Sequence, residues 1–415
     1  MKYLLTLISC VFIIIACSDE SDGMGPKQPP TDIKDSAART VIVYMSAEND
    51  LSPIALDDLQ EMAEGTAGIS PDMNLVAFVD LASKSRLPYI AKISNGKIVK
   101  DNSYVCNADF LSCDPEMMYE TLSWIMKHYP ASSYGLVLWG HATGWVISND
   151  TVADATQNRS TAGMNKAYGV DTGNNTADFG NAKWMNITQM AKVFERLPSK
   201  FDFLFADCCC FQCVESAYEL RNTVEYIVGS PAEIPGEGAP YSTVVPEMFK
   251  SGNIEECCSG IVDIYNGHPT EFNGRHTPLS VIKTAETENL AMATRLLLPE
   301  INASTESGTF TTDNVIYYFS SKRERFMYDM NDIIRTNVSE ASYIQWKEAL
   351  ERTVVYRKSS SKWDTNGYVN FWDFTVTEEK YGGISMFIPM EKYDAAGLDL
   401  NIKIKQMQWW DKVFR

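Results

Sequence analysis

The sequence predicts an α/β fold in which helices cover both faces of a mostly parallel sheet. Short, continuously apolar runs between polar segments are typical of strands that are buried on both faces. Such runs occupy residues 41–45, 75–79, 135–139 and 203–206. Segments with helical spacing separate them, which favours parallel strands joined by crossover helices. The 415 residues, of which 45% are hydrophobic, suffice for one large or two ordinary domains.

Local signals predict the elements of the first part of the chain. Ala55, Leu59 and Met62 share one face of a helix that follows the first strand. An Asn-Gly pair between two strand-like runs in 88–105 predicts a hairpin. Asp-Pro at 114–115 supplies the N-cap and the first residue of the next helix.

The pattern becomes less regular in the second part of the chain. A long polar stretch, 148–183, precedes a helix that has Met190, Val193 and Leu197 on one face. A helix over 212–221 and a strand over 225–229 follow the run at 203–206. Beyond residue 240, only 279–282 and 383–388 have the pattern of further strands, and helical segments are expected between them.

A histidine and a group of cysteines follow two of the buried strands. His141 comes just after 135–139, and Cys208, Cys209 and Cys210 come just after 203–206. In open α/β sheets, ligands bind outside the carboxyl ends of the strands. If the two strands are neighbours, an imidazole and a thiol meet at that edge, which is the minimal equipment for catalysis by a thiolate nucleophile.

The N-terminus has the features of a secretory signal. Lys2 is followed by a mostly apolar stretch and by a small residue before Cys17. The stretch is too short to span a bilayer comfortably. Residues 14–17 resemble a bacterial lipobox, and the acidic segment 18–22 is similar to the export tag of Bacteroidota surface lipoproteins.

These features predict a lipid-anchored protein of the cell envelope, on the outer-membrane surface or facing the periplasm. We expect a signal peptide over 1–17, lipidation of Cys17 and a flexible tether over 18–38, which is rich in Pro, Gly, Ser, Asp and Lys. Two or three acyl chains anchor a protein stably, whereas one gives only marginal binding. The lipid would be the only contact with the membrane.

The charge and the cysteines limit the partners. The formal net charge is −18 and the pI is near 4.7, so the surface repels nucleic acid and either attracts basic partners or serves solubility. Eight cysteines remain after Cys10 and Cys17, four of them within 208–213. Such clustering suits reactivity or metal binding better than a disulfide framework, although a bridge between Cys106 and Cys113 stays open.

Three blocks of sequence resemble the clostripain family of cysteine peptidases, in the caspase–gingipain–legumain clan. Residues 41–51 are similar to its opening strand and loop, 138–145 to its histidine motif and 207–219 to its nucleophile motif. The resemblance covers about 39–415 and implies a caspase-like α/β/α sandwich with a mostly parallel central sheet and a C-terminal extension. The catalytic core would occupy about 39–240 and the C-terminal part about 241–415.

The resemblance implies a Cys-His dyad. Aligning Asp207 and Glu215 with the acidic residues of the nucleophile motif places the nucleophile at Cys209, and His141 would protonate the leaving amine. A nearby imidazole or the start of the helix at 212 would favour the thiolate. Extended geometry would point Cys208 and Cys210 away from the face of Cys209.

The oxyanion of the reaction would be bound by backbone N–H groups of Cys209 and Ala142, as the resemblance implies. The family usually has glycine at the second position. Alanine keeps the donor but would be strained if its φ were positive.

The family resemblance also implies cleavage after Arg and sometimes Lys, so the partners would be proteins or peptides with basic residues. Asp207, Glu233 and Glu237 would supply acidic groups to the specificity pocket, and a planar carboxylate suits a guanidinium better than an ammonium. Asp207 has a second reading, in which it caps or orients its own loop.

Two further properties follow from the resemblance alone. Self-cleavage between the catalytic blocks would use Arg159 or Lys166. The activity needs no cofactor, although some relatives need calcium; Asp171 and Asp178 could supply oxygen ligands but match no defined calcium loop.

Three other functions compete with a peptidase. One is that of a catalytically inactive surface lipoprotein of the same fold that binds peptide or glycan ligands. A flavodoxin-like cofactor binder would need a Gly-rich phosphate loop after the first strand, which the sequence lacks. The pair Cys210 and Cys213 has the spacing of half a thiolate metal site, whose other half would need 257–258 with His268 or His276.

Overall fold

The computed structural model describes residues 36–83, 85–147, 168–173, 179–270 and 275–415. The chain from Asp35 onward forms one compact unit. In these ranges, no helix has the length and apolar character that crossing a membrane requires. The signal peptide with Cys17, the tether up to residue 35, and Arg159, Lys166 and Asp178 lie outside the described residues.

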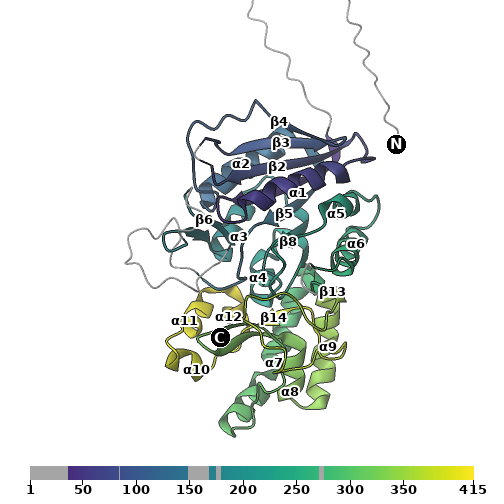
Figure 1. The fold of residues 1–415 in the computed structure, drawn as a ribbon. Coiled ribbons are helices and arrows are strands. Elements are labelled where there is room, and N and C mark those ends of the chain that lie inside the picture. The colour runs from purple at the N-terminus through teal and green to yellow at the C-terminus, as the bar shows by residue number, and fades with distance from the viewer. Residues whose placement is uncertain (1–35, 84, 148–167, 174–178, 271–274) are drawn as a thin grey trace, which may run out of the picture. The chain divides into compact units, whose positions relative to one another are not determined.

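A nine-stranded sheet forms the centre of the unit, in the order β13-β10-β9-β8-β5-β1-β2-β3-β4 (Figure 1). Its five central strands are parallel: β9 (Val224–Gly229), β8 (Phe201–Asp207), β5 (Ala131–Trp139), β1 (Ala37–Ala47) and β2 (Met73–Leu81). Two antiparallel strands extend each edge: β10 (Leu279–Lys283) and β13 (Val354–Lys358), and β3 (Tyr89–Ser94) and β4 (Lys97–Lys100).

Burial on both faces explains why the central strands are continuously apolar. Successive side chains of a strand point to opposite faces. In β1, Val41, Val43 and Met45 join one apolar cluster, whereas Ile42 and Tyr44 join the other. Both faces are therefore covered, and the predicted strands at 41–45, 75–79, 135–139 and 203–206 are confirmed.

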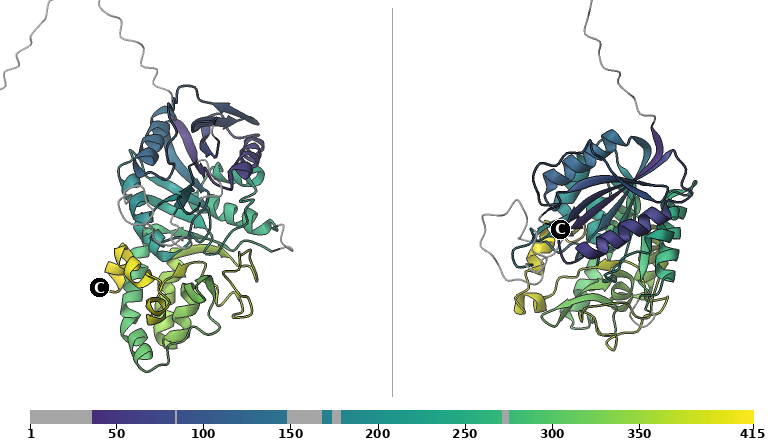
Figure 2. Two further views of the ribbon diagram at one scale, coloured as in Figure 1. Left: turned by 60° about the vertical axis from the view of Figure 1, so that its left-hand side comes forward. Right: turned by 45° about the horizontal axis from the view of Figure 1, so that its top comes forward.

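Helices of the same unit cover these two faces (Figures 1 and 2). One face packs against α1 (Ser52–Gly65), α5 (Tyr241–Met248) and α6 (Ile254–Gly267). The other packs against α2 (Pro115–His128), α3 (Ile187–Glu195), α4 (Val214–Leu220) and α7 (Thr287–Glu306). The predicted α/β sandwich with a mostly parallel sheet is confirmed.

Several local predictions hold in detail. The Asp114 side chain accepts hydrogen bonds from the N–H groups of Glu116 and Met117 at the start of α2. The hairpin between β3 and β4 turns at Asn95 and Gly96, whose φ values are +51° and +73°. Positive φ at both central residues is the geometry that an Asn-Gly pair adopts most easily.

The segment after β5 and the end of the chain differ from expectation. In the polar stretch 148–183 and at its end, β6 (Tyr168–Asp171) and β7 (Lys183–Met185) form a small sheet of their own. The strand expected over 383–388 is only β14 (Ser385–Met386), and it joins a three-stranded sheet rather than the main one. Both differences involve very short strands, whose apolar pattern is too brief to assign from sequence.

The described remainder of the C-terminal part contains this three-stranded sheet, further helices and short 3₁₀ turns. The sheet contains β11 (Tyr317–Ser321), β12 (Glu324–Asp329) and β14. The helices are α8 (Met330–Asn337), α9 (Glu340–Thr353), α10 (Glu391–Ala395), α11 (Leu400–Lys403) and α12 (Gln408–Val413), with a 3₁₀ turn at Ile404–Gln406; another at Thr284–Glu286 precedes α7.

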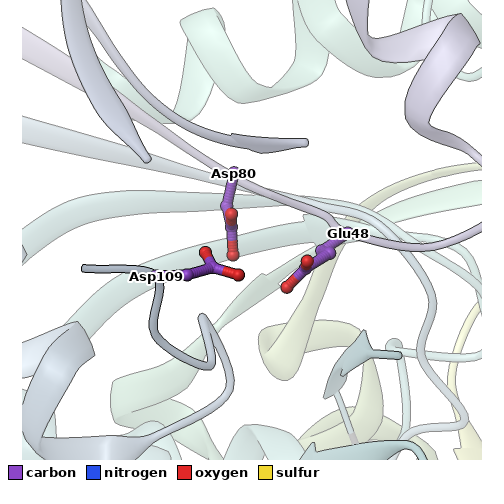
Figure 3. Close-up of side chains that lie close together, drawn as sticks. All are labelled: Glu48, Asp80 and Asp109. Carbon is purple, nitrogen blue, oxygen red and sulfur yellow. The ribbon is translucent and has the colours of Figure 1, made fainter. Parts of the chain in front are cut away.

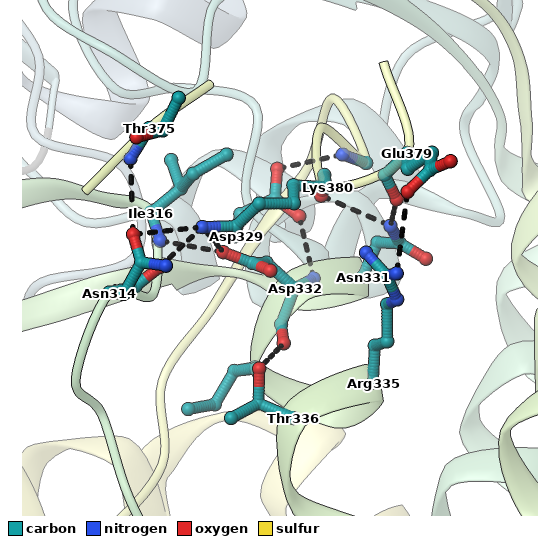
Figure 4. Close-up of polar contacts among 12 residues, drawn as sticks. Asn314, Ile316, Asp329, Asn331, Asp332, Arg335, Thr336, Thr375, Glu379 and Lys380 are labelled. Carbon is teal, nitrogen blue, oxygen red and sulfur yellow. Dashed lines mark hydrogen bonds and ion pairs between the residues drawn. The ribbon is translucent and has the colours of Figure 1, made fainter. Parts of the chain in front are cut away.

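A polar network fixes the loops around β11 and β12 (Figure 4). The buried carboxylate of Asp329 accepts hydrogen bonds from the Tyr318 hydroxyl (2.6 Å) and the Gly382 N–H (2.8 Å). Asp332 forms an ion pair with Lys380 (3.2 Å) and accepts a hydrogen bond from the Ile316 N–H (2.8 Å). Each acid in this network thus has a partner.

Candidate active site

The loops that carry the histidine and the cysteines lie next to each other. Strands β5 and β8 are paired in parallel, with Trp139 opposite Asp207 at their carboxyl ends. Just beyond this pair, the Gly140 N–H donates a hydrogen bond to the Asp207 carbonyl oxygen (3.4 Å). The expected neighbourhood of the two strands is confirmed.

A cavity of about 780 Å³ opens at this edge of the sheet. Its lining includes all six residues that the sequence proposed for catalysis, oxyanion binding and specificity: His141, Ala142, Asp207, Cys209, Glu233 and Glu237. Such a cavity is the size of an ordinary ligand site.

Cys209 differs from its two neighbours in exposure. Cys208 and Cys210 are fully buried, and burial raises the pKa of both thiols well above the usual value. Cys209 is partly exposed, lines the cavity, and its sulfur accepts a hydrogen bond from the Ile234 N–H (3.4 Å). Of these three adjacent thiols, Cys209 is the one that a substrate in the cavity reaches.

The reason for this difference is a turn rather than an extended strand. β8 ends at Asp207, and Cys210 has a φ of +55°, in the left-handed region. The alternation of side chains was expected only if the chain stayed extended here, and that condition is not met. The Cys210 N–H donates to the Ala232 carbonyl oxygen (2.8 Å), which holds the turn.

The helix after the turn begins later than 212. α4 starts at Val214 because Gln212 is held in a non-helical conformation. Its amide donates hydrogen bonds to the Ser280 and Ile227 carbonyl oxygens (2.8 and 3.2 Å), and its own carbonyl oxygen accepts one from the Ser385 N–H (3.0 Å). The expected boundaries 212–221 are corrected to Val214–Leu220.

His141 has a carboxylate partner that the sequence did not identify. Its Nε2 lies 2.8 Å from Oδ1 of Asp50, in the loop between β1 and α1. The histidine and aspartate side chains are 29% and 53% exposed, so the pair stands at the edge of the cavity. The sequence pointed to this residue only through the Asn-Asp pair in the motif at 41–51, and nothing in the motif showed that it faces the histidine.

Ala142 is accommodated without backbone strain. It is absent from the described non-glycine residues with positive φ, and it forms an isolated bridge with Tyr168. The left-handed conformations in this loop fall on Gly140 (φ +135°) and Gly144 (φ +61°) instead. Replacement of the usual glycine at 142 therefore leaves the loop geometry intact.

Asp207 is both a lining residue and a highly connected one. Its carboxylate accepts hydrogen bonds from the Tyr241 hydroxyl (2.6 Å), the Ala239 N–H (3.2 Å) and the Tyr265 hydroxyl (3.3 Å). Burial raises the pKa of Asp207 to about 6, against the lowering effect of these donors. The two readings of Asp207, pocket acid and loop anchor, are compatible.

A second acid, Asp58, lies close to Asp207 and was missed. Its Oδ2 accepts a hydrogen bond from the Trp139 indole (2.6 Å). Burial and the charge of Asp207 raise the pKa of Asp58 to about 8. A Cβ at Gly238 would lie 2.9 Å from Asp207 Oδ2 and 3.4 Å from Asp58 Oδ2, so only glycine fits over the two acids. Asp58 reads in the sequence as an ordinary helical residue.

Glu233 joins the cavity to the C-terminal part. Its carboxylate accepts hydrogen bonds from the Thr365 hydroxyl (2.7 Å) and the Asn366 N–H (3.0 Å). Phe319 and Tyr368, whose rings stack with centroids 4.3 Å apart, also line the cavity. These residues beyond 240 were not predicted, because no local pattern shows which distant loops reach a site.

Three carboxyl groups form a separate cluster beside this edge of the sheet (Figure 3). Atoms of Glu48, Asp80 and Asp109 lie within 4.8 Å of one another. Burial and the neighbouring Asp171 raise the pKa of Glu48 and of Asp80. Asp171, which the sequence offered as an available oxygen ligand, accepts hydrogen bonds from the Ser112 and Gly173 N–H groups (2.8 and 3.0 Å).

Among the described residues, the cysteines outside the turn are free thiols. Cys106 and Cys113 are not bridged. The Cys213 thiol donates a hydrogen bond to the Ser216 hydroxyl oxygen (3.0 Å), and the Cys257 thiol donates one to the Lys250 carbonyl oxygen (3.4 Å). Within the described ranges, Glu48, Asp80 and Asp109 are the one group of His, Cys, Asp or Glu side chains close enough to hold a metal ion.

Fold and site together define a cysteine peptidase of caspase-like fold. The chain belongs to the clostripain family, whose model matches residues 43–391. Clostripain from Hathewaya histolytica is 25% identical over 243 residues, which cover 51% of this chain and 42% of clostripain. The matched region thus spans less than half the length of that relative.

Two solved structures are similar over nearly the whole chain. A secreted C11 cysteine protease from Bacteroides thetaiotaomicron, in complex with an irreversible peptide inhibitor, has a TM-score of 0.68 at 26% identity. The similarity covers 89% of this chain and 99% of that one. An inactive zymogen C11 protease from Parabacteroides distasonis has a TM-score of 0.70 at 26% identity, with 92% and 100% covered.

Proposed function

We propose that this protein is a cysteine endopeptidase of the cell envelope that cleaves peptide bonds after Arg and sometimes Lys. The observation that carries the proposal is one cavity lined by a partly exposed thiol, an imidazole and a buried acid, from Cys209, His141 and Asp207. Family membership supports the peptidase activity. The similar protease from Bacteroides thetaiotaomicron is secreted, which supports the location.

The reaction follows from the chemistry of the dyad. The Cys209 thiolate attacks the scissile carbonyl carbon, and the charge that develops on the carbonyl oxygen is stabilised by the N–H groups of Cys209 and Ala142. His141 gives a proton to the leaving amine, and a thioester forms. Water then attacks the thioester with His141 as the base, which releases the acid and restores the thiol.

Asp50 gives His141 a defined orientation in this scheme. A carboxylate accepts the proton of the nitrogen it faces, so the Nε2–H donates to Asp50. Nδ1 is then the nitrogen that exchanges a proton with the thiol and the leaving amine. Asp50 acts as a positioning residue.

One buried acid, Asp207, supports the preference for a basic side chain. Asp207 with a pKa of about 6 is mostly ionised at neutral pH, and Asp58 lies near it. A carboxylate in a partly dry pocket binds a guanidinium through two hydrogen bonds, whereas an ammonium offers a point charge. Glu237 also lines the cavity.

Hydrolysis of fluorogenic peptides tests the proposal. An Arg-aminomethylcoumarin peptide should be cleaved faster than its Lys counterpart, and the Ala counterpart should be nearly inert. Cys209→Ala should lose at least about 10³-fold in kcat/KM, because covalent catalysis is gone. Cys106→Ala, which removes a partly exposed thiol outside the cavity, should retain wild-type rates.

An Arg-directed acyloxymethyl ketone provides the complementary measurement, since only a competent thiolate reacts with it. Labelling should fall on Cys209. Equal hydrolysis by Cys209→Ala would place the nucleophile elsewhere. No hydrolysis and no labelling of the wild type would favour the alternative, an inactive lipoprotein that binds peptides or glycans.

Lipidation of Cys17 and self-cleavage at Arg159 or Lys166 belong to the same proposal and rest on the sequence and the family resemblance. Mass spectrometry of the mature N-terminus and of active enzyme tests both. A soluble, unlipidated N-terminus would reject the anchor, and an intact active chain would reject required cleavage.

A further inference from the structure

The active-site cavity reaches from one face of the sheet to the other. At one end lies Asp207, whose hydrogen-bond partners Tyr241 and Tyr265 belong to the apolar cluster under α1, α5 and α6. Other lining residues come from the C-terminal part, and Phe319 among them belongs to the apolar cluster on the opposite face. The preference for a basic residue involves only the acidic end, which leaves the second end without an assigned role.

Tyr368 forms the surface of the cavity at this second end. Its ring stacks on that of Phe319, with centroids 4.3 Å apart and planes inclined by 19°. Phe319 is only 8% exposed and packs in turn against Phe326, at 5.5 Å between centroids. Tyr368 is half-buried, so its ring lines the cavity while Phe319 supports it from behind. A bound peptide would meet a flat, largely apolar surface here.

The segment that carries Tyr368 is held in place from two sides. The Tyr368 carbonyl oxygen accepts a hydrogen bond from the Ser320 hydroxyl (2.5 Å), which ties the segment to β11. Glu233 accepts hydrogen bonds from the Thr365 hydroxyl (2.7 Å) and the Asn366 N–H (3.0 Å), which tie the segment to the loop after β9. A surface that is already fixed loses little conformational entropy when a ligand docks on it.

Tyr368 also lies close to the nucleophile. Both Cys209 and Tyr368 pack against the apolar cluster that contains Phe319. Burial raises the pKa of Tyr368, and the charges of Glu233 and Cys209 add to this effect, so the ring is within electrostatic reach of the thiol. A peptide bond held at Cys209 therefore has Asp207 toward one face of the sheet and Tyr368 toward the other.

An extended peptide would use both ends of the cavity at once. Successive side chains of an extended chain point to opposite sides, so the neighbours of a basic residue that points to Asp207 point toward Tyr368. His141 must reach the leaving amine, and its aromatic neighbour is Phe179, at 6.0 Å between ring centroids. The part of the peptide after the cleaved bond thus lies on the side of Phe179. Tyr368 is left for the residue before the basic one.

We propose that Tyr368, supported by Phe319, forms a subsite for an apolar side chain on the residue directly before the cleaved Arg or Lys. The inference rests on the proposed peptidase function and narrows its substrates to extended segments in which an apolar residue precedes a basic one. A leucine or phenylalanine side chain covers the ring, whereas glycine leaves the ring in water. An acidic side chain is disfavoured, because Glu233 lies beside the ring.

Two fluorogenic substrates that differ in one residue test the subsite. Acetyl-Leu-Arg-aminomethylcoumarin and acetyl-Gly-Arg-aminomethylcoumarin share the basic residue and the leaving group, so the ratio of their kcat/KM values reports the preceding residue alone. In the wild type this ratio should be at least about tenfold in favour of Leu. Tyr368→Ala should lower the ratio at least about fivefold. The comparison between variants cancels the greater backbone freedom of glycine.

Two control variants define what the ring contributes. Tyr368→Phe should keep the wild-type ratio, because the ring face and not the hydroxyl makes the contact. Trp372→Ala removes an aromatic side chain of the same segment that is 94% exposed and does not line the cavity. It should also keep the ratio, and a loss there as large as in Tyr368→Ala would overturn the assignment to the Tyr368 ring.

Binding to an inactive variant separates the subsite from the peptidase proposal. Calorimetric titration of Cys209→Ala with acetyl-Gly-Leu-Arg-amide and acetyl-Gly-Gly-Arg-amide should give Kd values at least about fivefold apart, and adding Tyr368→Ala should remove the difference. A wild type that hydrolyses no Arg substrate would reject the peptidase proposal. A Leu preference in binding that depends on Tyr368 would still support the subsite, and equal Kd values would overturn it.

The hydrolysis results decide the matter in both directions. A wild-type ratio near one would overturn the subsite whatever the variants show, as would an unchanged ratio in Tyr368→Ala. If Tyr368→Ala gives no cooperative thermal transition, Tyr368→Gln, which removes the ring but keeps a long side chain, carries the comparison. Internally quenched peptides with Leu after Arg check the position. A preference that depends on Tyr368 there, and none for Leu before Arg, would overturn the placement before the cleaved bond.

Discussion

Glu215 is a buried acid whose cost depends on pH. Its side chain is fully buried, and Oε1 accepts a hydrogen bond from the Phe387 N–H (2.7 Å) while Oε2 has no partner among the described residues. Burial raises the pKa of Glu215 to about 8. The residue thus ties α4 to the C-terminal part, and at alkaline pH it carries a poorly solvated charge.

Glu215→Gln should therefore change how stability varies with pH. Between pH 5 and 8 the folded chain keeps a proton on Glu215 that the unfolded chain releases, so the wild type loses stability as the pH rises. One pKa unit corresponds to about 1.4 kcal/mol. The free energy of unfolding of the variant, measured by urea titration, should gain on the wild type by about that amount per pH unit.

A second substitution shows whether removal of any acid changes the pH dependence of stability. Glu348→Gln, an exposed change on α9, should run parallel to the wild type across the same range. A difference between Glu215→Gln and the wild type that stays constant from pH 5 to pH 8 would contradict the raised pKa.

Single residues also show how far the sequence could define the site. Cys209, His141 and Asp207 were predictable because each follows directly from a strand end or a motif position. Asp50 and Asp58 were not, since their roles depend on which distant side chains they face, His141 and Asp207. The three catalytic and specificity assignments remain predictions that the cavity supports.

At the scale of elements, the loop after β5 packs directly on the turn after β8. Gly144 is the point of contact: a Cβ there would lie 2.5 Å from the Cys210 carbonyl oxygen and 3.0 Å from the Cys213 sulfur. Its φ of +61° also lies in the left-handed region. The close approach of these loops brings the histidine and the cysteine to one cavity.

Gly144→Ala should disturb both loops at once. The left-handed conformation costs an alanine about 1–2 kcal/mol, and the contact with backbone adds about 1–3 kcal/mol. We expect a loss of about 2–5 kcal/mol in unfolding free energy and a fall of at least about tenfold in kcat/KM, because small displacements of a catalytic group are costly.

Gly308→Ala is the matched control for this change. Gly308 has a φ of +71°, but a Cβ there meets no atom within 4 Å. It should lose about 1–2 kcal/mol and keep full activity. Equal losses of unfolding free energy and of activity in the two variants would show that the contact between the two loops contributes to neither.

Elements of the sheet were predictable to different extents for a physical reason. The central strands bury both faces, so their sequences are apolar without interruption and stand out. β14 has two residues and β7 has three, too few for any periodicity to emerge. The start of α4 at Val214 was missed because Gln212 is held by β9 and β10, which local sequence does not reveal.

At the scale of the whole unit, the parts before and after residue 240 share one core. β10 and β13 belong to the same sheet as β1, and α5 and α6 cover one of its faces. One apolar cluster includes Ile42 of β1 and Val413 of α12. Neither part therefore has a complete core of its own.

A fragment of residues 36–240 should consequently fail to fold alone. Without the rest of the chain, β9 becomes an uncovered edge, Gln212 and Glu215 lose the backbone partners of Ser385 and Phe387, and the face under α5 and α6 is exposed. We expect no near-UV circular dichroism from the fragment and no cooperative urea transition, whereas residues 36–415 should unfold with coincident fluorescence and far-UV transitions. A sigmoidal urea transition of the isolated fragment, together with a native near-UV signal, would show that the catalytic part folds as an independent domain. The two parts would then touch through the shared core without depending on each other for stability.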